Sequence, residues 1–480
     1  MSKNGFTRMF QPLSIIEEEH IEYIHRGTLK VLRETGVTFR NNKALTLFRR
    51  NGCKVDFDES RVRFPSELVE ECIQKAPRCF QCKARDERNN VTIGGDTLTF
   101  APFSGMDTVD VNTWEHRRPT KDEYNNFIKV LDALENLHWI WGYPYYGFDG
   151  IPAVMCVPES VAGKIRHSTK FQLVANNEEA DIFAIEMAKT IGIDIMCVMA
   201  VSPPLTYYGE QIECGFRCVQ EGYPILLASG CIYGGSAPAT IAGAVVTTNA
   251  ELLAGLTLIQ LIKPGSKVLV QDFTFPMDMR TGTPAFGDIG SSLHHVVFNQ
   301  MWRRYGLPIN NASIGNAKKP DYQLSYEKII PCLLDALSGA NVTLLHGGIS
   351  AEISAHPLLA ILDDDVAGMI GRFVEGVIVN DETLALDLIN TVGPLPGIFL
   401  DKQHTLEWWK NEQYMTRAAD RLPYEQWKTS GKKGCLDYAK EIMEQILATH
   451  RPEPLTAGQE EDLERILANA RKYYKEKNKM

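Results

Sequence analysis

Short apolar segments rich in β-branched and aromatic residues alternate with amphipathic helical segments from about residue 97 onward. The apolar segments span residues 97–103, 138–143, 170–174, 196–202, 224–229, 267–272, 308–312 and 342–346. Helical periodicity fills the gaps between them, and a last helical segment at 358–378 can close the cycle. Eight strands separated by helices predict an α/β fold, a (β/α)8 TIM barrel.

One strand–helix–strand unit, between Gly306 and Ser350, is the most informative. Its first strand runs into Ser313-Ile314-Gly315-Asn316, a helix follows over 322–338, and its second strand ends in His346-Gly347-Gly348. Residues just past the carboxyl ends of parallel strands form the active sites of α/β enzymes. We therefore expect these two loops to contribute to a functional site.

An open, doubly wound sheet is the alternative that the same alternation allows. That fold places its ligand at a glycine-rich first crossover with the spacing Gly-x-Gly-x-x-Gly. The candidate segment, residues 229–235, lies in the middle of the chain and does not have this spacing. The barrel is therefore the favoured prediction.

The two ends of the chain have a different pattern. Residues 1–95 show helical periodicity and predict a helical N-terminal layer before a catalytic barrel at 96–400. Residues 401–480 are helical and highly charged, with tryptophans as apolar anchors, and predict a helical C-terminal arm. This arm is either a solvated surface or an interface, and we expect a homo-oligomer.

Composition narrows the classes of function. The chain has 480 residues, a net charge of −10 and no basic stripe, which argues against a nucleic-acid-binding protein. The sequence has neither 18 consecutive uncharged apolar residues nor a signal-peptide pattern, so we expect no membrane span and no secretion. Eleven cysteines, an odd number, favour reduced thiols in the cytoplasm.

Metal-ligand patterns are weak. Cys79-Phe-Gln-Cys82 is the one CxxC sequence, and two cysteines upstream of it are irregularly spaced, so solitary thiols are favoured over a zinc site. There is no HExxH motif, and the adjacent His294 and His295 must point to different faces of a helix. We therefore expect no metal ligands.

The predicted strand ends are rich in aromatic residues and glycine but poor in carboxylates. Asp272 is the one acid plainly offered, whereas a glycosidase needs two opposed acids, and no Gly-x-Ser-x-Gly elbow occurs. Aromatic faces suit a quaternary ammonium group, which donates no hydrogen bond, and each cation–π contact contributes about 0.5–2 kcal/mol. The candidate rings, for which core packing is the alternative, are Phe103, Tyr143, Tyr145, Tyr146, Tyr233, Phe273 and Phe275.

Several stretches carry a resemblance to a known family. They are Glu115-His-Arg-Arg-Pro-Thr120, Ser202-Pro-Pro-Leu205, Gly235-Ser-Ala-Pro-Ala-Thr240 continuing to Asn249-Ala-Glu-Leu-Leu-Ala-Gly255, Met279-Arg-Thr-Gly282, and Pro320-Asp321 with Tyr326-Glu-Lys. With them the chain resembles the trimethylamine methyltransferase superfamily, and more specifically its glycine betaine-type members without pyrrolysine. The resemblance covers nearly the whole chain and is most distinctive between residues 97 and 375.

The resemblance implies a (β/α)8 barrel that passes a methyl group from an amine to the Co(I) of a separate corrinoid protein. In the trimethylamine enzymes pyrrolysine stands six residues before the Pro-Asp pair, and the corresponding residue here is Ile314. An aliphatic side chain cannot act as that electrophile, so the expected substrate is a quaternary amine of the betaine or carnitine class, which leaves as a tertiary amine. The sequence has no Asp-x-His-x-x-Gly cobalamin motif, so we expect the cofactor on the partner and none on this chain.

On this interpretation no side chain of the chain is itself a catalytic acid, base or nucleophile. The expected substrate-binding residues are Phe103, Tyr143, Tyr146, Tyr233, Gln271, Phe273, Ile314, Asn316 and His346. A betaine carboxylate needs a hydrogen-bond donor, and His346 ranks before Asn316, Lys318 and Arg280 because it ends a strand. Glycines at the strand ends, such as Gly230, Gly315 and Gly348, would let a flat corrin approach.

Two other functions use the same scaffold. A non-catalytic binding protein for quaternary ammonium compounds would need the same aromatic cage. An aldolase or isomerase without a cofactor would need a lysine at a strand end, and Lys170 and Lys267 open their strands instead.

Overall fold

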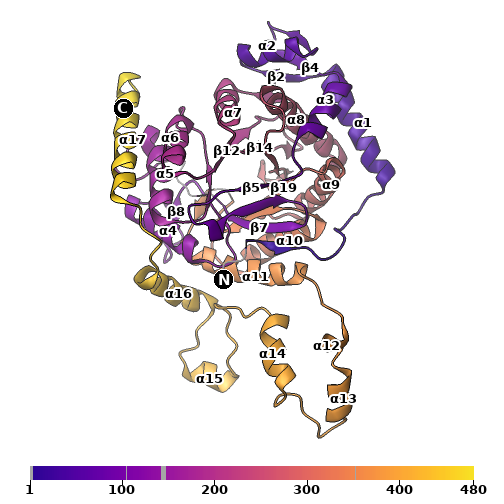
Figure 1. Cartoon of the computed structure of the whole chain (residues 1–480), viewed down its shortest axis with the longest axis vertical. Coiled ribbons are helices and arrows are strands. Elements are labelled where there is room, and N and C mark those ends of the chain that lie inside the picture. The colour runs from indigo at the N-terminus through magenta and orange to yellow at the C-terminus, as the bar shows by residue number, and fades with distance from the viewer. Residues whose placement is uncertain (1–3, 104, 142–146, 352) are drawn as a thin grey trace.

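The predicted barrel is present in the computed structural model, which describes residues 4–103, 105–141, 147–351 and 353–480. Eight parallel strands follow one another in the order β7-β20-β19-β16-β14-β12-β11-β10 (Figure 1). A hydrogen bond of 2.9 Å from His138 N to Phe100 O joins the β10 end of this sheet to β7 and closes the ring. The strands are β7 (Thr97–Pro102), β10 (Trp139–Ile140), β11 (Phe171–Val174), β12 (Ile195–Ala200), β14 (Ile225–Ser229), β16 (Val268–Asp272), β19 (Ile309–Ala312) and β20 (Val342–His346).

Helices surround the strands where the periodicity predicts them. They are α4 (Lys121–Ala133), α5 (Cys156–His167), α6 (Asp181–Ile191), α7 (Gly209–Glu221), α8 (Ile241–Ile262), α9 (Ile289–Tyr305), α10 (Tyr322–Ser338) and α11 (Pro357–Val374). Their ends follow local chemistry: Thr120 and Glu123 form a capping box on α4, and Gly306 ends α9 in the left-handed conformation. α8 is long and apolar enough to cross a membrane, but 78% of its most apolar window is buried, so it serves as a core helix.

Strand alternation separates two apolar layers. On β16, Leu269 belongs to the cluster inside the barrel, whereas Val268 and Val270 belong to the cluster between strands and helices. On β20, Val342 and Leu344 likewise point inward and Leu345 packs outward. This period of two fixes which side chains of each strand can reach the lumen.

The N-terminal layer contains the expected helices and also strands that the prediction missed. The helices are α1 (Glu18–Glu34), α2 (Asn42–Arg50) and α3 (Ser66–Lys75). The strands are β1 (Phe6–Thr7), which pairs with β7; β2 (Val37–Phe39), β3 (Lys54–Asp56) and β4 (Arg61–Arg63), which form a sheet with β13 (Thr206–Tyr207); and the hairpin of β5 (Cys79–Cys82) and β6 (Val91–Gly94). A strand of two to four residues is too short to show a period of two, so the helical pattern did not reveal these strands.

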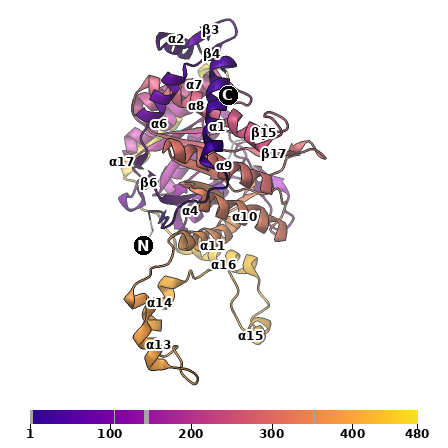
Figure 2. The same ribbon diagram turned by 90° about the vertical axis from the view of Figure 1, so that its right-hand side faces the viewer.

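The C-terminal part has two distinct regions. α16 (Cys435–Thr449) packs on α11 and α4, and α17 (Ala457–Glu476) packs on α5 and α6. Between α11 and α16 the chain projects away from the barrel (Figures 1 and 2), so the boundary predicted at residue 400 falls inside the projection. The projecting helices are α12 (Asp381–Leu384), α13 (Leu386–Val392), α14 (Gln403–Glu412) and α15 (Tyr424–Thr429).

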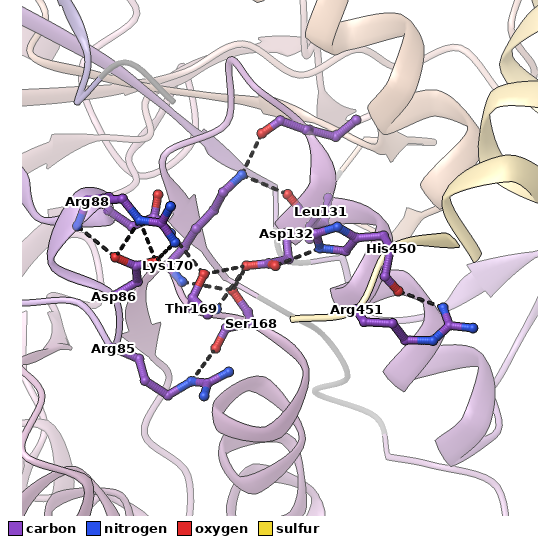
Figure 3. A network of polar contacts seen from close by, with 12 residues as sticks. Arg85, Asp86, Arg88, Leu131, Asp132, Ser168, Thr169, Lys170, His450 and Arg451 are labelled. Atoms are coloured by element: carbon purple, nitrogen blue, oxygen red, sulfur yellow. Dashed lines mark hydrogen bonds and ion pairs between the residues drawn. The ribbon is translucent and has the colours of Figure 1, made fainter. Parts of the chain in front are cut away.

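Asp132 at the end of α4 holds the C-terminal region to the barrel (Figure 3). Its carboxylate accepts hydrogen bonds from Ser168 Oγ and His450 Nε2, both 2.8 Å long, and from Thr169 N at 2.9 Å. Burial raises the pKa of Asp132, but the bond from His450 and the charge of Lys170 outweigh it, so the pKa lies below its ordinary value. The ionised form is therefore the one that the fold stabilises.

Asp132→Asn is expected to lower the free energy of unfolding at pH 6 by about 1–3 kcal/mol, because a buried charged acceptor is lost. The folded pKa lies below the unfolded value, so this stabilisation is complete above about pH 4 and disappears as the pH falls through the folded pKa. Denaturant titrations at pH 6 and pH 3 should show the gap between wild type and variant closing on acidification. A constant gap would contradict the role of the ionised carboxylate, and Glu71→Gln, at an exposed side chain on α3, serves as control.

Gly255 lets α8 approach the barrel closely. A Cβ at this position would lie 2.3 Å from Tyr207 Oη and 2.7 Å from Leu227 Cδ1. Gly255→Ala is therefore expected to destabilise the protein by about 1–3 kcal/mol, although alanine favours helices. The same change at Gly27 on α1, whose Cβ would lie 3.6 Å from Val246, should stabilise it by about 0.5–1 kcal/mol. Thermal unfolding of both variants measures the difference, and equal shifts would contradict the close packing.

Candidate active site

Aromatic rings gather at the carboxyl end of the barrel. Phe103, Trp141, Phe273 and Ile314 belong to one apolar cluster inside the ring of strands. The rings of Phe103 and Phe273 are parallel within 9°, with centroids 6.4 Å apart, and Phe273 is only half-buried. Ile314 is 1% exposed within this cluster. The structure therefore brings together three of the predicted residues and adds Trp141, which lies in a predicted strand but was not assigned to the site.

Two amide side chains point into the lumen below the rings. Gln271 on β16 and Asn310 on β19 are register partners, and they alternate with Val270 and Asn311, which face the outer helices. Within the described residues, Gln271 Oε1, Asn310 Oδ1 and the Trp141 indole N–H have no hydrogen-bond partner. Buried polar atoms without partners are rare in folded proteins, so these groups indicate a place for a ligand or water.

A second polar network lies behind the strands and not in the lumen. Asp272 Oδ2 lies 2.7 Å from His294 Nδ1, and His295 Nδ1 lies 3.0 Å from Asp335 Oδ1, which ties α9 and α10 to the strand ends. Burial raises the pKa of Asp272, but the two histidines outweigh it and hold the pKa below its ordinary value. Asp335 likewise outweighs burial and raises the pKa of His295. Asp272 Oδ2 is thus paired with His294, and Nε2 of His295 lies 4.0 Å from the same oxygen. Within the described residues, Asp272 Oδ1 and the Nε2 atoms of both histidines have no hydrogen-bond partner.

His346 lies away from the ring cluster. The strand pairing of β20 shifts register between Leu344 and His346. The fully buried imidazole consequently lies beside Phe100 in the outer layer, with Nε2 3.5 Å from Asp364 Oδ1 on α11. This position does not fit the predicted role as first donor to a substrate carboxylate.

The remaining predicted residues that the structure describes do not join the ring cluster. Tyr233, on β15 (Ile232–Tyr233), stacks on His294 of α9 at 6.3 Å. Asn316 donates to Pro284 O at 3.2 Å and lines a separate cavity of ≈ 440 Å³. Arg280 also lines that cavity and is paired with Asp278. Tyr143 and Tyr146 lie outside the described residues, and Tyr145 does too.

A group of polar side chains beside the rings, here called the polar rim, was missed in the choice of site residues. It consists of Asp107, His116, Arg118, Ser350 and Ser354, of which His116 and Arg118 are in the motif at 115–120. The hairpin of β8 (Thr108–Val109) and β9 (His116–Arg117) places His116 Nδ1 2.6 Å from Ser354 Oγ and Nε2 3.3 Å from Ser350 Oγ. Burial raises the pKa of the Asp107 carboxyl above its ordinary value, and the charges of Arg118 and His116 partly oppose this rise. The motif itself was the signal that could have found this rim.

Ser350 has a φ of 58° and the following residue a φ of 62°, both in the left-handed region. Non-glycine residues rarely adopt this conformation, and such strain gathers at functional sites. The strained turn joins β21 (Gly348–Ile349) to β22 (Ser354–Ala355) and presents the Ser350 hydroxyl to His116. The backbone of this turn therefore fixes the position of the Ser350 hydroxyl in the polar rim.

The space beside the glycines at the mouth is occupied by other residues of the chain. A Cβ on Gly230 would lie 3.3 Å from the Phe273 backbone, and one on Gly348 would lie 3.3 Å from the Phe103 side chain. Gly315 packs in the same way against Glu327. Gly230 and Gly348 therefore let the Phe273 and Phe103 rings pack closely against the backbone. The space beside all three glycines is occupied, which does not support the prediction that they leave room for a corrin.

The cysteines give one compact group. Cys79 is exposed and Cys82 is buried on the short strand β5, so the CxxC pair does not converge on one ion. Among the described residues, Cys197, Cys214 and Cys218 have sulfur atoms within 4.8 Å of one another. These three thiols are buried between β12 and α7, on the outer side of the barrel, and take no part in the mouth.

Comparison with known proteins places this geometry in a family. The family described as "Trimethylamine methyltransferase (MTTB)" matches residues 1–474. A glycine betaine methyltransferase of Desulfitobacterium hafniense strain Y51 is 31% identical over 467 residues, covering 95% of this chain and 96% of its own. Trimethylamine methyltransferase MttB of D. hafniense strain DSM 10664 / DCB-2 is 30% identical over 456 residues, covering 92% and 91%.

The crystal structure of the monomethylamine methyltransferase MtmB of Methanosarcina barkeri has the same fold. It superposes with a TM-score of 0.54 at 12% identity and covers 93% of this chain and 90% of its own. The fold, the nearly full-length relatives and the family match agree with the resemblance carried by the sequence motifs. The chain belongs to the trimethylamine methyltransferase family and is a methyltransferase of the TIM-barrel type.

Proposed function

We propose that this enzyme transfers a methyl group from a quaternary amine of the betaine or carnitine class to the Co(I) of a separate corrinoid protein, leaving a tertiary amine. The observation that carries the proposal is Ile314, an aliphatic residue inside the ring cluster at the position where the trimethylamine enzymes have pyrrolysine. The glycine betaine methyltransferase relative supports the same substrate class.

The lumen suits a permanently charged nitrogen. Phe103, Trp141 and Phe273 offer ring faces, and the oxygens of Gln271 and Asn310 can contact the polarised methyl groups. No proton has to be supplied when the C–N bond breaks, because its electron pair leaves with a neutral tertiary amine. The described lumen accordingly contains apolar and amide side chains, and the acid Asp272 faces the outer helices.

The polar rim supplies a donor for a substrate carboxylate. Among the described residues, Arg118 is exposed and makes no ion pair, while His116 is held by two serines. Both lie beside the mouth formed after β7 and β20. We therefore assign the carboxylate end of a betaine to Arg118 and His116 in place of His346.

The methyl acceptor provides the nucleophile, and this chain positions the donor. The enclosed rings exclude water and hold one N–CH₃ bond toward the carboxyl end of the barrel, where the partner's corrinoid would approach. The cobalamin is assigned to the partner because the chain's sequence has no Asp-x-His-x-x-Gly motif.

A substrate screen tests the proposal. The protein is mixed with a reduced corrinoid protein and, in separate reactions, with glycine betaine, proline betaine, carnitine, γ-butyrobetaine and trimethylamine, and the Co(I) absorbance is followed. We expect loss of the Co(I) band with at least one quaternary amine and none with trimethylamine. Tight binding with no spectral change for any quaternary amine would overturn the proposal and favour a non-catalytic binding protein.

A further inference from the structure

Residues 377–400, the first part of the projection between α11 and α16, expose large apolar side chains that the described chain does not cover. Val377 is 77% exposed, Leu395 is 92% exposed and Leu400 is 79% exposed. Leu386 and Ile389 on α13 are 59% and 50% exposed. Isolated apolar residues on a surface are ordinary, but a continuous exposed set of this size marks an interaction surface.

The helices of this segment are too short to be stable alone. α12 has 4 residues and α13 has 7, and neither has a buried residue. Isolated helices below about 12 residues are marginal in water, and most helical stability in proteins comes from packing an apolar face. The segment therefore requires a surface to pack against.

An apolar groove at the base of the projection offers such a surface. It has a volume of ≈ 840 Å³, and its walls include Leu13, Leu337, Met369 and Phe373. Met369 and Phe373 on α11 are 48% and 58% exposed, although both are large and apolar. The groove has room for several side chains.

Charge favours residues 377–400 as the occupant of the groove. Between residues 376 and 401 the chain contains Asp381, Glu382, Asp387 and Asp401 but no lysine or arginine. The groove is edged by Arg421 and by Arg372, which is paired with Glu412 at 3.4 Å, so these three side chains give the edge a net positive charge. An acidic apolar segment thus matches a groove with two arginines at its edge.

The segment cannot easily fill the groove of its own chain. Val377, where the projection begins, is itself a wall of the groove, and α12 and α13 then lead away from the body (Figures 1 and 2). We propose that residues 377–400 of one copy occupy the α11 groove of a second copy, and that the exchange is reciprocal. Because each copy carries both the segment and the groove, the contact is self-complementary and closes with two-fold symmetry.

Light scattering on the full-length chain tests the exchange. The wild type is expected at a mass of two or more copies of the 53.8 kDa chain. Leu386→Glu/Ile389→Glu in the segment, and Met369→Glu/Phe373→Glu in the groove, are each expected to give a 53.8 kDa species with an unchanged circular dichroism spectrum. Tyr23→Glu, at an apolar site of 70% exposure on α1, should keep the wild-type mass.

Mixing the two variants gives a second readout. One intact segment and one intact groove meet when a segment variant pairs with a groove variant, so the mixture should recover part of the dimer while each variant alone does not. A monomeric wild type, unchanged mass in both variants, or no recovery on mixing would each overturn the proposal. A wild-type monomer whose segment is needed only to bind the corrinoid protein would assign the surface to that partner instead.

Discussion

Replacing Phe103 and Phe273 together by leucine is expected to lower kcat/KM for a quaternary amine by roughly 5- to 900-fold. Each ring contributes a cation–π contact of about 0.5–2 kcal/mol, and the two together give about 1–4 kcal/mol. Leucine keeps the apolar volume, so the barrel should remain folded, but it removes the ring faces. Steady-state kinetics at matched corrinoid concentration measures the effect.

The matched control is Phe275→Leu. This ring belongs to the same cluster but packs between Phe286, at 4.5 Å, and His295, at 6.1 Å, so its loss is expected to change kcat/KM little. Binding of 3,3-dimethylbutyrate, the neutral carbon isostere of glycine betaine, separates charge recognition from packing. If the double variant weakens the isostere as much as the betaine, the rings recognise shape alone and the cation–π account is wrong.

The second large effect is expected at the rim. Arg118→Ala should weaken glycine betaine binding by roughly 10- to 150-fold, because a hydrogen bond to a charged group contributes about 1.5–3 kcal/mol. Choline has the same ammonium group and no carboxylate, so its affinity should not change. Calorimetric titration with both ligands measures the two dissociation constants.

Arg118→Lys should recover part of the betaine affinity, since the charge is kept while the planar fork of donors is lost. Arg88→Ala, at an exposed arginine paired with Asp86, is the matched control and should leave both affinities unchanged. Equal losses for betaine and choline in Arg118→Ala would contradict an assignment of Arg118 to the carboxylate.

Much of the barrel could be predicted because its signals are local. Each of the eight strands is a compact apolar run, and helix ends such as Thr120 and Gly306 have characteristic capping residues. A period of two along β16 also indicates that Gln271 and Asp272 face opposite sides. The sequence alone did not say which side was the lumen, and the structure places Gln271 there and Asp272 behind it.

Other features depend on geometry that a pattern does not carry. His346 ends its strand as predicted, but a register shift turns its ring toward Phe100 and Asp364. The β8–β9 hairpin brings His116 to Ser350 and Ser354, which lie more than 200 residues further along the chain. No local spacing in the sequence indicates this pairing. Trp141 was not singled out because a tryptophan in a predicted strand is typical of core packing. Only the structure shows that its indole N–H has no hydrogen-bond partner among the described residues.

The region predicted as a C-terminal arm contains two parts that differ in how they pack. α16 and α17 pack on the barrel, while the exposed segment begins at about Val377, directly after α11. Its apolar residues are typical of a core, and their exposure, which the sequence does not reveal, is the observation on which the proposed contact with a second copy rests. That is why the expectation of a homo-oligomer becomes specific only with the structure.

The central claim is that the barrel aligns one methyl group of a quaternary amine with a cobalt centre carried by another protein. The most direct measurement is a single turnover with the quaternary amine that the substrate screen identifies, labelled by CD₃ on nitrogen, followed by mass spectrometry of the corrinoid and the amine. We expect labelled methyl on the corrinoid and an equal amount of the tertiary amine lacking one CD₃ group. Binding of the labelled amine without label transfer, or equal methyl transfer from trimethylamine, would contradict the claim.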